Sequence, residues 1–350
     1  MKSHGCIAVA AAVISALILL SCTGKDAAKS GNPENKNRIA VFVPGVVSGN
    51  SVYEMLVSGV QLAAEETGKE GKTVGVTVIE AGAVQAEWEN KLTALAASDD
   101  YDLVITSNPA MPDIIAPVSA KFPKLEFIVF DAWAQGNPRV TSFRYNQREQ
   151  AYISGYIAAL VSSSDMKFAN REKKIGVIAG QEYPAMLNVI LPAYLEGACA
   201  VDPEFTVDFR VVGNWYDATK GAELARSLKN AGVDVIMPIS GGANQGVIAA
   251  AKESGFYLAW FDDNGFSKAP GYVVSSAIMA QERLAREVTK EWLEGTLIKG
   301  EPKTVGIAGS YIDFVDKDPL YIETVPAGIR ERQDVLMKRL RSGDLMLPVQ

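Results

Sequence analysis

Short apolar runs rich in β-branched residues alternate along the chain with longer segments whose apolar positions recur every three or four residues. The short runs predict strands at 39–43, 74–80, 103–107, 127–131, 140–143, 175–179, 206–212, 235–239, 258–262 and 273–276, with a last strand-like stretch at 305–314. The longer segments predict helices at 51–67, 85–98, 149–161, 185–200, 218–231 and 280–295. This alternation is typical of parallel sheets with crossover helices. The number of units exceeds one comfortable sheet, so we expect an α/β protein with two Rossmann-like lobes joined by a hinge.

The N-terminus has the pattern of an export signal. Lys2 precedes an apolar or small run over 6–20, which is shorter than the roughly 20 residues that span a bilayer. We therefore predict a signal peptide over 1–21. The residues before Cys22 resemble a lipobox, which implies lipidation of that cysteine, and the polar segment 22–37 predicts a flexible tether.

Composition narrows the possible chemistry. Cleavage before Cys22 removes His4, the single histidine, and leaves Cys199 as the remaining thiol besides the lipidated one. The mature chain then has no histidine for Ser-His-Asp or Cys-His catalysis and no internal disulfide. We expect no enzyme, no metal site and no cofactor. The net charge of −7 and the scattered basic residues argue against nucleic acid as a partner.

Ligands of open parallel sheets bind beyond the carboxyl ends of the strands, so the loops there are the candidate site. They hold most of the tryptophans and several tyrosines: Trp88, Trp133, Trp215, Trp260, Tyr53, Tyr145, Tyr183 and Tyr216. These aromatic residues either plug the interface between two lobes or stack on a flat ring system.

Polar side chains fall in the same loops: Asn50, Asn108, Asp131, Asn146, Asn214, Asn244, Gln245, Asp262 and Asp263. Carboxylates and amides at strand ends can bond to the hydroxyls of a sugar or polyol, and each of them can equally cap a helix. The glycine-rich loop 241–246 follows a strand and opens a helix, but it lacks the lysine and the spacing of a phosphate-binding loop.

Several of these segments resemble the basic membrane protein (BMP) family of lipoproteins, which includes purine nucleoside receptors of ABC importers. The matching segments are 130–131, 149–155, 214–221, 239–247 and 261–263. The resemblance implies a type I periplasmic-binding fold with three crossings between the lobes, closure around a ligand, and an ABC permease and ATPase as partners. It places Asp262 at ribose hydroxyls, Trp215 or Tyr216 on the base, the backbone of Gly241 and Gly242 near the ligand, and Asp131 in the cleft.

The first loop departs from the nucleoside receptors. It reads GVVSGNSVY over 45–53, without the acidic residue and with Val52 in place of a phenylalanine. Together with the extra tryptophans, this makes the chain similar to the riboflavin-binding lipoproteins of the family. A flavin offers a tricyclic plane for the aromatic residues, a methylated edge for Val46, Val47 and Val52, and a ribityl chain for the polar side chains.

We therefore expect a monomeric riboflavin-binding receptor of an ABC importer, exported and lipid-anchored to a membrane facing the periplasm, most simply the inner membrane. Its first lobe would span 38–143 and about 263–314, and its second 144–262 and about 315–350. The expected ligand-binding residues are Asn50, Tyr53, Trp88, Asn108, Asp131, Tyr145, Trp215, Tyr216, Gly242, Asn244 and Asp262. A purine nucleoside receptor is the nearest alternative; a receptor for a sugar or autoinducer, an exported enzyme and a structural surface lipoprotein are the others.

Overall fold

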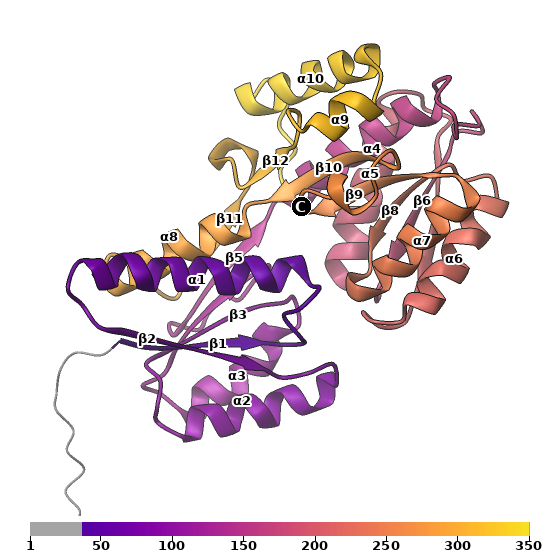
Figure 1. The fold of residues 1–350 in the computed structure, drawn as a ribbon. Helices are drawn as coiled ribbons and strands as arrows, with labels where there is room; N and C mark the ends of the chain where they lie inside the picture. Colours follow the sequence, from indigo (N-terminus) through magenta and orange to yellow (C-terminus); the bar gives the residue numbers. More distant parts are fainter. Residues whose placement is uncertain (1–36, 350) are drawn as a thin grey trace, which may run out of the picture. The chain divides into compact units, whose positions relative to one another are not determined.

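The computed structural model describes residues 37–349, which form two six-stranded sheets (Figure 1). The first sheet has the order β11-β5-β4-β3-β1-β2. Its strands are β1 (Asn37–Val43), β2 (Val74–Glu80), β3 (Leu103–Ser107), β4 (Glu126–Phe130), β5 (Val140–Tyr145) and β11 (Pro302–Val305). The second sheet has the order β12-β10-β9-β8-β6-β7. Its strands are β6 (Lys174–Ala179), β7 (Thr206–Val211), β8 (Val235–Ile239), β9 (Tyr257–Asp262), β10 (Val273–Met279) and β12 (Ile312–Phe314). All paired strands are parallel except β10 and β12.

Two mostly parallel sheets with crossover helices confirm the predicted α/β fold, and the predicted strands differ from the observed ones by a few residues at their ends. The stretch 305–314 was predicted as one strand, but it contains the end of β11, a 3-10 turn and β12. The prediction also lacked α3 (Met111–Lys121), α9 (Pro319–Thr324) and α10 (Ala327–Ser342). In α3, Pro112 and Pro117 obscure the helical pattern, because a proline inside a helix removes a backbone hydrogen bond.

Helices cover both faces of the first sheet (Figure 1). Successive side chains of a strand point to opposite faces. In β1, Ala40 and Phe42 pack with buried residues of α2 (Trp88–Ala97) and α3. Ile39 and Val41 belong instead to the core that contains α1 (Ser51–Lys69). Burial of both faces explains why the strands read as continuous apolar runs.

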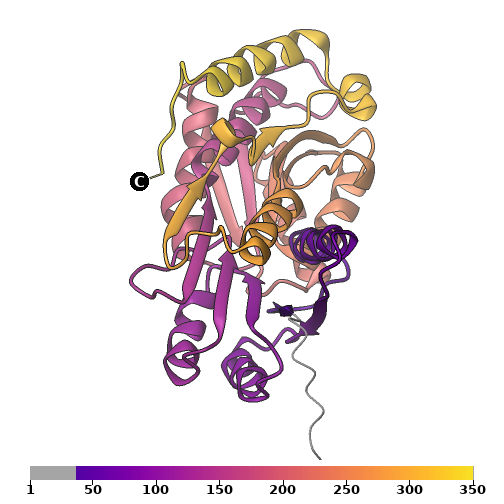
Figure 2. The same ribbon diagram turned by 90° about the vertical axis from the view of Figure 1, so that its left-hand side faces the viewer.

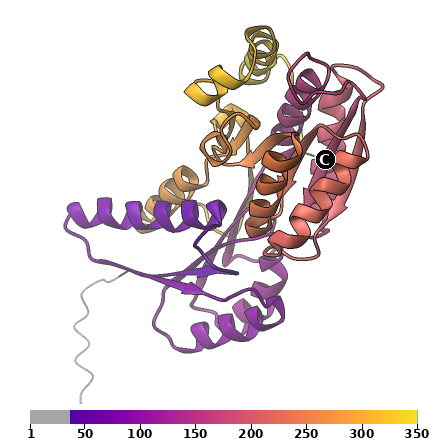
Figure 3. The same cartoon turned by 45° about the vertical axis from the view of Figure 1, so that its right-hand side comes forward.

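The second sheet carries α4 (Gln147–Ser162), α5 (Leu191–Cys199), α6 (Ala218–Asn230) and α7 (Asn244–Ser254). Helices α6 and α7 lie side by side (Figures 1 and 3). Helices α4 and α5 touch through their backbones. A Cβ on Gly155 would lie 1.9 Å from the carbonyl oxygen of Tyr194, and a Cβ on Gly197 would lie 2.1 Å from that of Tyr152. The two glycines therefore allow an approach that no other residue permits.

The chain passes between the sheets three times within the described residues: between β5 and β6, between β10 and β11, and between β11 and β12. Only β11 and α8 (Gln281–Glu294) return to the first sheet, where α8 packs beside α1 (Figure 2). The predicted assignment of 263–314 to the first lobe was therefore too long. Strands β10 and β12 belong to the second sheet, because β10 pairs with β9 and β12 pairs with β10.

The predicted signal peptide, the lipidation site Cys22 and the predicted tether up to residue 36 lie outside the described residues. Asn37, which was expected to end the tether, is the first residue of β1. Between residues 37 and 349, every helix is too short or too polar to cross a bilayer.

Candidate ligand-binding cleft

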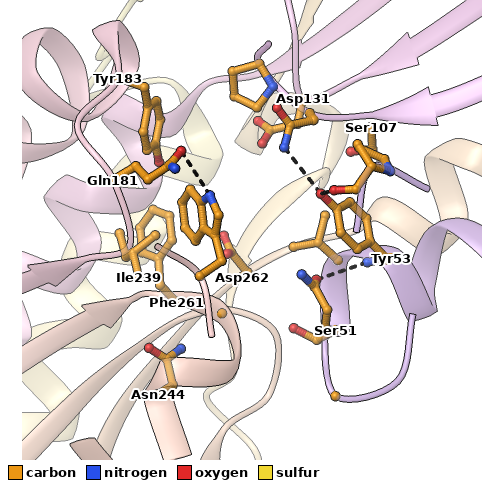
Figure 4. A pocket seen from close by; sticks show the side chains of 18 of the residues that line it. Ser51, Tyr53, Ser107, Asp131, Gln181, Tyr183, Ile239, Asn244, Phe261 and Asp262 are labelled. Carbon is orange, nitrogen blue, oxygen red and sulfur yellow. Dashed lines mark hydrogen bonds between the residues drawn. The ribbon is translucent and has the colours of Figure 1, made fainter. Parts of the chain in front are cut away.

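A cavity of about 530 Å³ lies where the carboxyl ends of the strands of both sheets meet. This volume falls in the range of roughly 300–1,000 Å³ that small-molecule sites occupy. The first sheet contributes the loop after β1, residues 107–110 at and beyond the end of β3, and Asp131 after β4. The second contributes residues 181–183 after β6, 215–216 after β7, several residues after β8 and 260–262 in β9. Figure 4 shows Gln181 and Tyr183 on one side, with Tyr53 and Ser107 on the other.

All but two of the predicted ligand-binding residues line this cavity: Asn50, Tyr53, Trp88, Asn108, Asp131, Trp215, Tyr216, Asn244 and Asp262. Tyr145 does not, because it is 2% exposed and its hydroxyl donates to Oε1 of Gln281 at 3.1 Å. Gly242 packs beneath the backbone of residues 215–216, and its neighbour Gly241 lines the cavity instead. The binding role of the lining residues stays a prediction.

Trp215 forms an aromatic wall on the side of the second sheet. Its ring centroid lies 6.2 Å from that of Tyr183, at an interplanar angle of 45°. Its indole N–H donates to Oε1 of Gln181 at 3.2 Å. Behind it lies Gly180, where a Cβ would stand 2.4 Å from Cε3 of the indole. The absence of a side chain at Gly180 therefore lets the indole lie flat against the end of β6.

Tyr53 lies on the side of the first sheet. Its hydroxyl donates to the carbonyl of Pro44 at 3.1 Å and accepts from the side-chain amide of Asn108 at 3.2 Å. Burial raises the pKa of Tyr53 far above its ordinary value, so the phenol stays neutral. Asn50 caps α1 by accepting from the backbone N–H of Tyr53, and Asn244 accepts from that of Ser240 at 3.0 Å. The capping interpretation is therefore confirmed for Asn50, whereas Asn244 bonds back to the loop before α7 and does not cap that helix.

The other tryptophans divide between the two interpretations offered by the sequence. Trp88 is 4% exposed and donates to a backbone carbonyl, and Trp260 is 5% exposed and donates to the carboxylate of Asp263. Both line the cavity while serving mainly as core residues. Trp133 does not line it; the guanidinium of Arg144 lies 4.0 Å from the centre of its ring. Trp215 is thus the remaining tryptophan of the cavity lining, and its stacking on a ligand stays a prediction.

Two of the carboxyl groups in the cavity lining, those of Asp131 and Asp262, have strongly shifted pKa values. Burial raises the pKa of Asp131 to about 7. Burial, followed by the charge of Asp131, raises the pKa of Asp262 well above its ordinary value. The adjacent Asp263 is engaged with Trp260 and with the ammonium of Lys268, which lies 3.0 Å away. The described residues contain no group of three acidic, histidine or cysteine side chains that could hold a metal ion.

Sequence reasoning named Gln245 of the cavity lining but missed the glutamines at 147, 150 and 181. Gln181 holds Trp215, and Gln147 and Gln150 donate to the two carboxylates from the first turns of α4. A usable signal was present, because two glutamines three residues apart at the start of a helix lie on one face. The stretch that contains them comes directly after a predicted strand, where a ligand site was expected.

Comparison with known proteins finds one matching family and several relatives of similar sequence. The model of the Bmp family, described as ABC transporter substrate-binding protein PnrA-like, matches residues 36–345. The chain is 24% identical over 340 residues to basic membrane protein A2 of Borrelia garinii, with 95% of this chain and 93% of that protein covered. It is 25% identical over 254 residues to the ABC transporter nucleoside-binding protein BmpA of Lactococcus lactis, with 72% and 69% covered.

A solved structure shares the fold. The crystal structure of an ABC transporter solute-binding protein from Aeropyrum pernix superimposes with a TM-score of 0.75 at 20% identity, over 89% of this chain and 93% of that one. At this identity the likeness concerns the fold alone.

Proposed function

The chain belongs to the Bmp family of ABC transporter substrate-binding proteins, and from this premise we propose that its cleft binds riboflavin for uptake. A protein of this class is not an enzyme; it works with the permease and the ATPase of its transporter. Riboflavin combines a flat three-ring system with a chain of hydroxyl groups. Both parts need matching surfaces within a single cleft.

The observation that carries this proposal is the pairing of an aromatic wall with two carboxylates. Trp215 and Tyr183 form a broad surface on the second sheet, and Tyr53 lies on the first. Aromatic surfaces in offset contact add about 0.5–1.5 kcal/mol beyond area burial. Asp131 and Asp262 supply acceptors for hydroxyl groups in the same cavity.

The charges of the lining support a ligand without phosphate. Four carboxylates line the cavity, those of Glu54, Asp131, Glu182 and Asp262, against the single ammonium of Lys268. That ammonium is already paired with Asp263. A phosphate ester would bring negative charge into a cavity whose lining offers no unpaired cation, and enclosing an unpaired charge costs free energy. This favours riboflavin over its phosphate and, equally, a nucleoside over a nucleotide.

Enclosure is the proposed mechanism. Ligand that touches both sheets binds the closed arrangement more tightly than an open one, and it shifts the equilibrium by that difference in affinity. The three crossings between the sheets are the connections about which such closure takes place.

A purine nucleoside is the second candidate. It is favoured by the similarity to a relative that is named a nucleoside-binding protein. Against it stands Val52, which lines the cavity where the nucleoside receptors carry a phenylalanine by the sequence resemblance.

The test is spectroscopic. Protein purified without refolding is examined for visible flavin absorbance and fluorescence, and any ligand released on denaturation is identified by mass. Protein stripped of ligand is then titrated with riboflavin, riboflavin phosphate, inosine and guanosine. Tight binding of riboflavin and weak binding of its phosphate are expected. Binding of inosine or guanosine with no binding of riboflavin would refute the riboflavin proposal and indicate a purine nucleoside receptor.

We also propose that Cys22 is lipidated and anchors the exported protein to a membrane. Each buried methylene of an acyl chain contributes about 0.8 kcal/mol, so several chains together anchor a protein stably. Metabolic labelling with palmitate is expected to mark the wild type and not Cys22→Ser. Labelling of both would refute this site.

A further inference from the structure

The two cleft carboxylates occupy equivalent places in the two sheets. Asp131 directly follows β4, which lies between β3 and β5, and Asp262 ends β9, which lies between β8 and β10. Each follows a phenylalanine, and both have a positive φ, 52° for Asp131 and 77° for Asp262. Residues other than glycine rarely adopt this backbone region, and such strain concentrates at functional sites.

One helix holds both carboxylates. The side-chain amide of Gln147 donates to Oδ1 of Asp131 at 3.2 Å, and that of Gln150 donates to Oδ1 of Asp262 at 3.3 Å. The two glutamines are three residues apart at the start of α4, so they lie on one face of the helix. Gln150 is fully buried and also donates to the carbonyl of Ala277 in β10 at 3.0 Å, which fixes its position.

Neutral amide donors suit this task better than cations. An arginine or lysine would bring a positive charge and occupy more of the acceptor capacity of each carboxyl group, whereas an amide takes part of that capacity and adds no charge. Among residues 37–349, no other donor bonds to either carboxylate, so Oδ2 of both Asp131 and Asp262 is left for a ligand. The hydrogen bond from Gln150 also lowers the pKa of Asp262, against the effect of burial and of the neighbouring charges of Asp131 and Asp263.

We propose that Gln147 and Gln150 are positioning residues that aim one carboxylate from each sheet at the hydroxyl chain of a single ligand. This inference rests on the proposed function for the identity of that ligand. The glutamines do not read the ring system; they set the geometry in which hydroxyl groups can bridge Asp131 and Asp262. Both glutamines therefore govern the preference for a hydroxylated ligand over the bare ring.

The test compares ligands that share a ring and differ in the hydroxyl chain. Gln147→Met and Gln150→Met remove the amide and keep the length of the side chain, and Gln61→Met on the exposed face of α1 is the control. Riboflavin and lumiflavin, which carries a methyl group in place of the ribityl chain, are titrated against each protein. We expect riboflavin affinity to fall roughly tenfold or more in both cleft variants, because hydrogen bonds to charged groups contribute that order of magnitude. Lumiflavin affinity is expected to stay within about twofold, with no change in the control.

Equal losses for riboflavin and lumiflavin would overturn the inference, because they would indicate a general disturbance of the cleft. If the wild type binds inosine and not flavins, the proposed ligand fails, and the ratio of inosine to hypoxanthine then carries the same test. A measurement without ligand adds a second readout. Gln150→Met is expected to raise the pKa of the Asp262 carboxyl group, which an NMR titration measures. An unchanged pKa would overturn the assignment of Gln150 whichever ligand the protein takes.

Discussion

The substitution Gly180→Ala tests whether the indole of Trp215 is the wall on which the ligand rests. Gly180 is buried at the end of β6, and its backbone is fixed on both sides. Its N–H donates to the carbonyl of Ile239 at 2.8 Å, and its carbonyl accepts from Gly213 at 2.9 Å. The added Cβ would stand 2.4 Å from the indole, whereas carbon atoms in contact lie about 3.5–4.0 Å apart. The indole therefore has to move by roughly 1 Å.

The direction in which the indole moves decides how much the substitution changes stability and ligand affinity. The indole borders the cavity of about 530 Å³, so it can shift into empty space without compressing the core. We expect the free energy of unfolding to change by less than about 1 kcal/mol, below the usual cost of overpacking a closed core. Ligand binding loses stacking and contact area together, about 1–3 kcal/mol, which corresponds to roughly a 5- to 150-fold increase in Kd.

Riboflavin titration followed by quenching of flavin fluorescence measures the affinity, and urea unfolding measures the stability. Gly75→Ala in β2 is the matched control, because a Cβ there meets nothing within 4 Å. Unchanged riboflavin affinity in Gly180→Ala, with the displaced indole visible in near-ultraviolet circular dichroism, would refute the stacking role of Trp215. A large loss of stability would refute the argument that the indole has room to move.

Three further changes have defined outcomes. Trp215→Ala is expected to weaken riboflavin binding by about 2 kcal/mol or more, roughly thirtyfold in Kd. Asn108→Ala is expected to weaken it by less than about fivefold, because the side-chain amide already makes hydrogen bonds within the protein. Equal losses of affinity in titrations would contradict this ranking. Because burial raises the pKa of Asp131 to about 7, riboflavin affinity is expected to fall as the pH drops through that value while the ligand-free protein gains stability. Asp131→Asn should remove both effects in titrations and melting curves, and their persistence would exclude Asp131 as their source. Gly155→Ala is expected to lower the free energy of unfolding by about 3 kcal/mol in urea, against little change for Gly68→Ala; comparable stability would show that α4 and α5 can separate cheaply.

Strand positions could be predicted well from the sequence, because runs buried on both faces are apolar at every position and short. The helix α3 could not, since its prolines are typical of a loop, and its packing against the first sheet is visible in the structure alone. The sheet to which β10 belongs could not be predicted from the sequence either. The sequence shows that it is a strand but carries no sign that it pairs with β9 and not with a strand of the other sheet.

Within the site, residue type and strand-end position located Asp131, Asp262 and Trp215 correctly at the cavity. The same reasoning placed Tyr145 there, although its hydroxyl turns to Gln281, far along the chain. Position along a strand fixes where a side chain begins, whereas its direction depends on partners that the sequence does not bring together.

The backbone contact between α4 and α5 makes the two glutamine contacts unequal. Through Gly155 and Gly197, α4 packs closely against α5 and forms one packed body with the second sheet. The contact from Gln150 to Asp262 lies inside that body, so rotation of the sheets leaves it intact. The contact from Gln147 to Asp131 links the body to the first sheet. If the cleft opens by rotation of the two sheets, we expect this second contact to lengthen, which would couple opening of the cleft to weaker binding of the ligand.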